Sequence, residues 1–495
     1  MGRRRNKQRQ KINPDQEDDE DLAQGREANS AHSDTPVPVL ATQPNGPCMA
    51  VAHDTQLWLL NSRAASLTQL DDSATGAPIR AVALDPSGSL ILSGGDDKTL
   101  RVWQINSRQL LHQWSVPKKI SAAIFTADGS YAIFADKFGD VHVAATAESA
   151  IGGPRPLLGH FCSIITDLAA SPDGKYLVST DRDSKVRVSM LPKEPLQGAH
   201  EIQSYCLGHT SFVTACAFVT TSDCTLLASA GGDGTVRLWD HVSGELLDTC
   251  QVPAVRALAA VVEQVEADAQ AAAAAKLPEQ EAPGTANLDS APSSTADMEV
   301  GDAAANGSGY ESDNEDNDED APGPRHNAPE PATAAALALA ASPDGRYLAV
   351  LVEFQDEVTI LTVDASGRKL AMSQRLAMHD LALPTAVQFD REGRLWAIGR
   401  PRSGSAGALK MGIASLDASG KEFVSAGEED VPEALRAALA AVVDGGQTVQ
   451  AGPLGQVNPQ LRKRVYTEAE TDFRKRNRRD ITHKAASAAA AVSSE

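Results

Sequence analysis

From residue 37 onward, short apolar runs alternate with clusters of Gly, Asp, Ser and Pro. Residues 80–84, 90–92 and 100–103 are examples of such runs. Segments this short, each bounded by turn-forming residues, are typical of β-strands rather than helices. The hydrophobic pattern therefore predicts an all-β fold.

The strand pattern repeats along the chain. Turn segments Asp-Pro-Ser-Gly at 85–88, Ala-Asp-Gly at 127–129 and Ser-Pro-Asp-Gly at 171–174 and 342–345 each precede an apolar strand. A period of about 40–50 residues with four short strands per unit predicts a WD40-type β-propeller. We expect seven blades, over residues 38–72, 76–114, 117–148, 157–195, 205–250, 252–258 resumed at 332–367, and 383–425.

Composition divides the rest of the chain. Residues 1–36 are polar and charged, which predicts a disordered tail, and 259–331 read as a low-complexity, disordered insert in the sixth blade. Seven of the ten residues 311–320 are acidic. The propeller is expected to occupy 37–258, with blades one to five and the start of the sixth, and 332–425, with the remainder. Residues 426–495 are expected to hold a short helix, at 429–443, and a basic, Ala-rich tail.

The net charge of −21 hides basic clusters at both ends, at residues 3–11 and 462–479. Such clusters favour nuclear import, although phosphate-contacting arms and a solvated charge run are alternatives. The six cysteines show no zinc-ligand spacing, so we expect no metal site and a reducing compartment. No apolar run reaches the length of a membrane span, so the sequence predicts a soluble, intracellular protein, with the nucleus as its location.

Polar residues of the fifth unit fit the internal hydrogen-bond network of a blade. His209, Ser229, Asp233 and Trp239 fall where such a repeat pairs a buried imidazole, hydroxyl, carboxylate and indole. The position of the Asp recurs as Asp97 and Asp183 in the second and fourth units. A His/Asp/Ser set also suggests nucleophilic catalysis, but the blade architecture already explains it, so no catalytic residue is assigned.

A glycine-rich segment at 231–234 superficially resembles a phosphate-binding loop. It lies between two predicted strands and lacks the following helix whose N-terminus would bind a phosphate. We therefore expect no nucleotide, S-adenosylmethionine or other cofactor, and no small-molecule substrate of its own.

The fourth unit departs from the repeat pattern. Lys185 replaces the usual Thr, Ser189 replaces the Trp, and Arg182 lies in the turn. Strand alternation places Lys185 and Arg187 on one face, so the three cations suit an acidic partner or a phosphate. A solvated face with weak local ion pairs is the alternative.

The block from Asp181-Arg182-Asp183 to Ser189, followed by Cys206-Leu207-Gly208-His209-Thr210, resembles the non-catalytic WD-repeat subunit of the eukaryotic tRNA (guanine-N7) methyltransferase. The segment at 135–141 fits the same family, whereas units one, two and seven resemble it less, and the insert and tail depart from it. The resemblance implies a scaffold in a heterodimer with a Rossmann-type catalytic subunit, which carries the cofactor and the chemistry.

The resemblance also implies a role for this chain. It would stabilise and orient the catalytic subunit and help hold tRNA while a guanine of the variable loop is methylated at N7. Residues Arg182, Lys185 and Arg187, with Lys137, would face the partner. A generic interaction module, such as a ubiquitin-ligase substrate receptor or a chromatin adaptor, is the alternative, since fold does not fix function.

Overall fold

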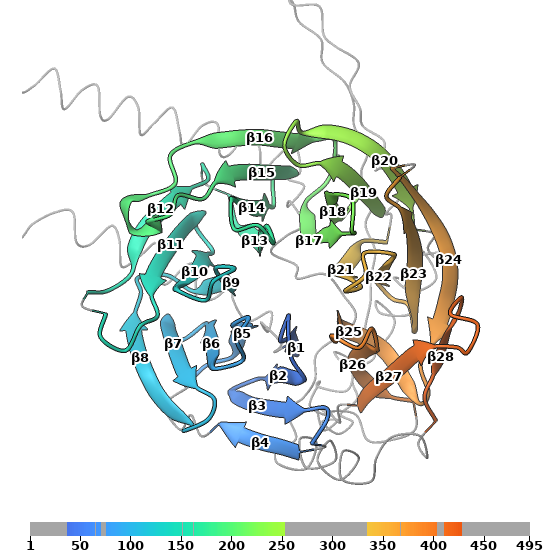
Figure 1. Cartoon of the computed structure of the whole chain (residues 1–495), viewed down its shortest axis with the longest axis horizontal. Coiled ribbons are helices and arrows are strands. Elements are labelled where there is room, and N and C mark those ends of the chain that lie inside the picture. Colours follow the sequence, from blue (N-terminus) through green and yellow to red (C-terminus); the bar gives the residue numbers. More distant parts are fainter. Residues whose placement is uncertain are drawn as a thin grey trace, which may run out of the picture. The chain divides into compact units, whose positions relative to one another are not determined.

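Seven antiparallel sheets of four strands each surround a common axis in the computed structural model (Figure 1). The structure describes residues 37–252, except 65, 71–75, 151 and 162, and residues 334–427, except 367 and 403–409. These residues belong to one compact unit, formed by chain on both sides of residues 258–332. The described residues thus form the seven-bladed WD40-type propeller that the repeat pattern predicts.

Each blade consists of four strands that follow one another directly in the sequence. The first four blades are β1 (Val39–Thr42), β2 (Cys48–His53), β3 (Gln56–Asn61), β4 (Ser66–Leu70); β5 (Ile79–Leu84), β6 (Leu90–Gly95), β7 (Thr99–Gln104), β8 (Gln109–Ser115); β9 (Ile120–Phe125), β10 (Tyr131–Asp136), β11 (Asp140–Ala145), β12 (Arg155–Gly159); and β13 (Ile165–Ala170), β14 (Tyr176–Asp181), β15 (Lys185–Met190), β16 (Ile202–Leu207). A short 3-10 helix, η1 (Pro195–Gln197), lies between β15 and β16.

The remaining blades follow the same order. They are β17 (Val213–Thr220), β18 (Thr225–Gly231), β19 (Thr235–Asp240), β20 (Glu245–Gln251); β21 (Ala336–Ala341), β22 (Tyr347–Val352), β23 (Glu357–Asp364), β24 (Lys369–Ala377); and β25 (Leu381–Phe389), β26 (Leu395–Pro401), β27 (Lys410–Leu416), β28 (Phe423–Ser425). Blades three, four and six end at 159, 207 and 377, further along the chain than the expected units. The described strands of blade six all follow residue 334.

The repeated turns begin strands by the same side-chain mechanism. In blade four, Ser171 Oγ donates to Asp173 at 2.6 Å and accepts from the backbone N of Tyr176 at 2.9 Å. Gly174 has a φ of +70°, which favours glycine. Residues 342–347 of blade six repeat both side-chain hydrogen bonds at the same distances. A short Ser-x-Asp-Gly sequence therefore sets the start of a strand in both blades.

The hydrophobic core is divided among the junctions between neighbouring blades. One cluster joins blades four and five through Val186, Val188, Cys206, Cys216 and Trp239, all buried. Blades five and six share a smaller cluster, in which Phe212 packs against Ala335. Each blade is therefore stabilised mainly by its neighbours, as in other repeat architectures.

The ring closes between blades seven and one, where β25 contacts β1. Because each of the seven described sheets is built from four consecutive strands, none of the described strands is exchanged across this junction. Apolar residues of both blades form one core there: Leu40, Met49, Val51, Trp58, Leu60, Ala386, Trp396 and Ile398. Ring closure thus depends on side-chain packing rather than on shared backbone pairing.

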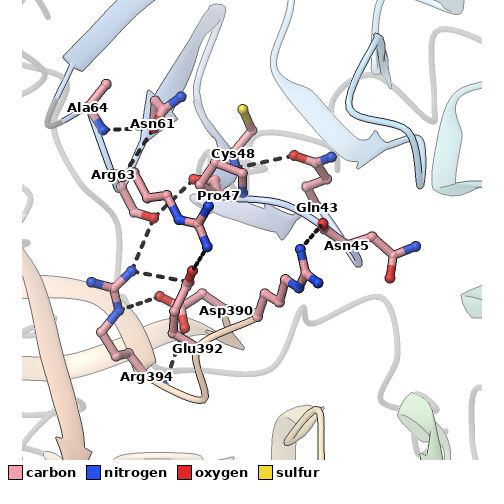
Figure 2. Close-up of polar contacts among 12 residues, drawn as sticks. Gln43, Asn45, Pro47, Cys48, Asn61, Arg63, Ala64, Asp390, Glu392 and Arg394 are labelled. Carbon is pink, nitrogen blue, oxygen red and sulfur yellow. Dashed lines mark hydrogen bonds and ion pairs between the residues drawn. The ribbon is translucent and has the colours of Figure 1, made fainter.

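Polar contacts cross the same junction (Figure 2). Arg63 of blade one pairs with Glu392 of blade seven at 3.0 Å. Arg394 donates to Ser62 at 3.1 Å while it is held by Asp390 at 2.7 Å. The Arg63 pair is exposed and contributes little, whereas Arg394 links a buried carboxylate to the other blade.

A buried carboxylate joins blades four and five. Asp167 on β13 accepts from the backbone N of Cys216 on β17 at 2.9 Å, and from that of Leu168 at 2.8 Å. Desolvation by burial raises the pKa of Asp167 to about 6, against the opposing effect of these hydrogen bonds. The folded protein therefore holds a proton here more tightly than the unfolded chain does.

This shift predicts a pH dependence of stability with a defined sign. Because the folded-state pKa is raised, the contribution of Asp167 is most favourable below pH 4 and falls as pH rises from about 4 to 6. The full penalty is at most about 3 kcal/mol. Replacement of Asp167 by Asn should remove this component, measured as the difference in unfolding free energy between variant and wild type at pH 4.5 and 7.5. A constant difference across this range would contradict the assignment.

Candidate functional site

Four side chains of blade five form one continuous hydrogen-bond network. His209 Nε2 lies 2.8 Å from Ser229 Oγ, and Nδ1 lies 3.0 Å from Asp233 Oδ2. Trp239 Nε1 donates to the same Ser229 Oγ at 2.8 Å. Burial by itself raises the pKa of Asp233. The hydrogen bond and charge of His209 outweigh this effect, so the pKa lies below its ordinary value. His209, Ser229 and Trp239 are buried and Asp233 is partly buried, so the network lies inside the blade and holds its turn in place.

Blade four contains the same arrangement with a different carboxylate. His160 Nε2 lies 2.7 Å from Ser179 Oγ and Nδ1 lies 3.0 Å from Asp181 Oδ2. The repeat pattern in the sequence placed Asp183 at the position of Asp233, but in the structure the imidazole of His160 pairs with Asp181. In blade five the position of Asp181 is Gly231, so the imidazole pairs with the turn residue Asp233. In blade four Asp181, at the end of β14, takes that place, and Asp183 in the following turn donates its backbone N to Asp181 at 2.9 Å.

Asp97 has a related but simpler role in blade two. Its carboxylate accepts from the backbone N of Thr99 at 3.1 Å and pairs with Arg101 at 2.5 Å. It therefore fixes the turn between β6 and β7 and the arginine of the next strand.

The carboxylate of Asp181 makes a second interaction, within the segment 181–189 that departs from the repeat pattern. Asp181 Oδ1 accepts from the backbone N of Lys185 at 3.0 Å, while Oδ2 holds His160. One buried carboxylate thus fixes both the segment after β12 and the turn between β14 and β15. The position of Lys185 on the surface follows from this shared support.

The predicted cations of blade four lie in different environments. Lys185 is exposed at the start of β15, and Arg182 is partly buried in the turn. Arg187 is only 9% exposed and donates to the carbonyl of Gly159 at 3.0 Å and to Ser189 Oγ at 2.9 Å. Burial lowers the pKa of Arg187. Lys185 and Arg187 therefore do not form one exposed cationic face, and the missing Trp gives Arg187 a hydroxyl acceptor inside the blade.

Equivalent backbone hydrogen bonds show which turn residues correspond between blades. The residue after the second strand donates its N–H to the carbonyl just before the first strand, with Asp96, Lys137, Arg182 and Gly232 as donors in blades two to five. Lys137 and Arg182 thus occupy the same place in neighbouring blades. Lys137 Nζ lies 3.6 Å from Asp96, which also pairs with Arg80 at 3.0 Å and Lys119 at 3.5 Å.

Three exposed apolar side chains lie beside these cations and were not predicted from the sequence. Phe161 is 91% exposed, Leu207 63% and Phe138 61%. For Phe138 and Phe161 the signal that could have found them was a large aromatic residue in a turn segment, at Asp-Lys-Phe-Gly and directly after Gly-His. Periodicity did not reveal these two residues because it reports only positions inside strands, and Leu207, at the end of β16, carried no such turn signal.

The described residues offer one group with metal-ligand spacing. The ligand atoms of Asp136, Asp140 and His142 lie within 4.8 Å of one another. Asp136 already accepts from the backbone N of Phe138 and of Asp140, at 2.8 and 3.1 Å, and pairs with His142 at 3.5 Å. These contacts within the blade account for the arrangement. None of the helical segments in the described part of the chain has the length and hydropathy that crossing a bilayer requires.

The model of the tRNA methyltransferase TRM82 WD40 domain matches residues 2–151 and 144–283, more than half of the chain. The chain belongs to this family. Among curated proteins, the chain is similar to the human tRNA (guanine-N(7)-)-methyltransferase non-catalytic subunit WDR4, with 34% identity over 217 residues, which are 42% of this chain and 51% of the relative. The Dictyostelium discoideum non-catalytic subunit wdr4 is 29% identical over 234 residues, 43% of this chain and 48% of the relative.

The matches therefore span about half the length of these relatives. Among solved structures, the β-propeller domain of Myceliophteria thermophila Cps50 (Swd1) is similar at 10% identity and a TM-score of 0.49, over 74% of this chain and 94% of that chain. The family membership rests on the sequence match, and the propeller on its own strand order.

Proposed function

We propose that this chain is the non-catalytic scaffold subunit of a heterodimeric tRNA (guanine-N7-)-methyltransferase. The observation that carries the proposal is the family match over residues 2–283, together with relatives named as non-catalytic subunits of that enzyme. In this function the partner holds the cofactor and performs the methyl transfer. The propeller stabilises and orients the partner and helps hold tRNA.

The geometry of blades three and four supports a docking role for their shared edge. Lys185 is exposed and rigidly placed by Asp181, and Arg182 lies in the same turn. Lys137 occupies the equivalent turn position in blade three. Arg187 contributes by holding the Gly159 carbonyl, and so by positioning this edge from inside the blade.

Deletion of the gene is expected to abolish N7-methylguanosine in tRNA, because the catalytic subunit would lose its scaffold. Mass spectrometry of digested tRNA measures the modification, and expression of the wild-type chain should restore it. Affinity purification of the intact chain should recover a methyltransferase. Full methylation in the deletion strain would overturn the proposal, and recovery of only ligase or histone components would favour a generic interaction module.

We further propose that the complex acts in the nucleus. The basic clusters at residues 3–11 and 462–479 support nuclear import. Both clusters lie outside the residues that the structure describes, as do the acidic segment at 311–320 and the helix expected at 429–443.

A further inference from the structure

Comparison of equivalent positions between blades distinguishes the edge of blades three and four. Phe138 stands directly after Lys137, where blades two, four and five have Asp97, Asp183 and Asp233. A phenylalanine that is 61% exposed thus replaces a carboxylate in the turn between β10 and β11. More than half of the phenylalanine is exposed to water, and the Nζ of Lys118 lies over its ring, 4.0 Å from the ring centroid.

The same comparison applies to the other two apolar residues. Phe161 follows His160, where blade five has the polar Thr210 after His209. Leu207 pairs with Lys185 across β15 and β16, and the corresponding residues opposite Thr99 and Thr235 are Ser115 and Gln251. At each of the three positions an exposed apolar side chain therefore replaces a polar one.

Backbone contacts hold the three positions together at one edge. The backbone N of His160 donates to the Gly139 carbonyl at 2.7 Å, which links the neighbours of Phe161 and Phe138. Asp181 binds both His160 and the backbone N of Lys185, whose cross-strand partner is Leu207. We name Phe138, Phe161 and Leu207 the edge patch.

We infer that the edge patch is the apolar anchor by which this chain binds its protein partner, and that the partner presents an apolar surface bordered by acidic side chains. This inference rests on the proposed function. Buried aromatic anchors inside a polar rim are where binding energy concentrates in protein interfaces. Cations outnumber acids in the rim, with Lys185, Arg182 and Lys118 beside Asp140 and Asp183, so acidic groups on the partner complement it.

The charges around the edge patch favour a protein over RNA. Exposed Asp140 and partly exposed Asp183 lie among the cations. Surfaces that bind nucleic acid backbones are strongly and uniformly basic, because each contact with a phosphate releases counterions and so adds to the binding affinity. A surface of mixed sign with an aliphatic leucine suits a protein interface.

The test uses the intact chain and the purified catalytic tRNA (guanine-N7) methyltransferase subunit of the same organism. Phe161→Ser is expected to weaken binding about 30-fold, and Phe138→Ser with Phe161→Ser more than about 100-fold, as for interface hot spots. Lys185→Glu should instead make the affinity less sensitive to salt and act mainly on the association rate. Met372→Ser and Val424→Ser, exposed apolar residues of blades six and seven, serve as matched controls and should bind like wild type.

A photo-crosslinking benzoylphenylalanine at position 161 gives a second measurement, independent of affinity. A crosslink to the methyltransferase, absent from the same probe at position 372, supports the edge patch. Crosslinking to added tRNA alone overturns it in favour of an RNA contact. If the wild-type chain binds but the double variant binds equally well, only the edge patch is wrong; if the wild-type chain does not bind, the proposed function falls and the edge patch with it.

Discussion

Arg187→Glu is expected to destabilise the propeller by about 3–5 kcal/mol, rather than to remove a surface contact. Arg187 is buried and donates to the Gly159 carbonyl at 3.0 Å and to Ser189 at 2.9 Å. A glutamate at this position places a desolvated carboxylate against a carbonyl oxygen, without a donor to replace the guanidinium. The effect should appear in chemical unfolding as a lower midpoint at unchanged slope.

Two variants separate this structural role from a role in docking. Arg187→Met keeps an unbranched side chain and removes the charge, so its loss of stability should be smaller than that of Arg187→Glu. Lys185→Glu, on the exposed neighbour, should leave the unfolding free energy within about 0.5 kcal/mol. If Arg187→Glu unfolds like wild type yet loses the partner, Arg187 is a direct contact, as the sequence suggested.

Trp396→Ala is expected to lower the free energy of unfolding by about 3–5 kcal/mol and to open the ring at the junction of blades seven and one. Trp396 is fully buried in the apolar core of that junction, and its Nε1 donates to Asp390 at 2.8 Å. The variant loses one of the two tryptophans of this core and leaves the buried carboxylate of Asp390 short of one donor. Because none of the strands that the structure describes crosses the junction, pairing among them does not offset the lost packing.

Hydrogen exchange measured by mass spectrometry locates the effect. Exchange in Trp396→Ala should rise first in β1, β2, β25 and β26, on both sides of the junction. Trp103→Ala is a matched control, because Trp103 packs in the core between blades one and two. Its exchange should rise in those blades instead. A loss of unfolding free energy below about 1 kcal/mol, or faster exchange spread evenly around the ring, would show that Trp396 does not stabilise this junction in particular.

The sequence-based expectations succeeded where local patterns carry the structure. Turns such as 171–174 place their own Ser and Asp side chains on the next strand, so a short segment fixes the strand start. The hydrogen-bond set of His209, Ser229, Asp233 and Trp239 follows from the same repetition. Blade boundaries were less accurate in blades three, four and six, where the fourth strand lies beyond the expected end of the unit.

Alternation alone misjudged the cations of blade four. It correctly places Lys185 and Arg187 two residues apart on one strand, but exposure depends on what lies above each side chain. The Gly159 carbonyl, 28 residues away in the sequence, covers Arg187, while the start of β15 leaves Lys185 in solvent. Repeat position likewise pointed to Asp183 rather than Asp181, because only the folded blade shows that the carboxylate at the end of β14 reaches the imidazole of His160.

The sequence by itself determined the class, the number of blades and the family of this chain, because strand periodicity, turn chemistry and the block at 181–189 are local. The tertiary structure alone decided which carboxylate meets His160, which arginine is buried, and that the ring closes without strand exchange. It also brought Phe138, Phe161 and Leu207 to one edge. These features depend on contacts between residues distant in sequence, whose geometry exists only once neighbouring blades pack against each other.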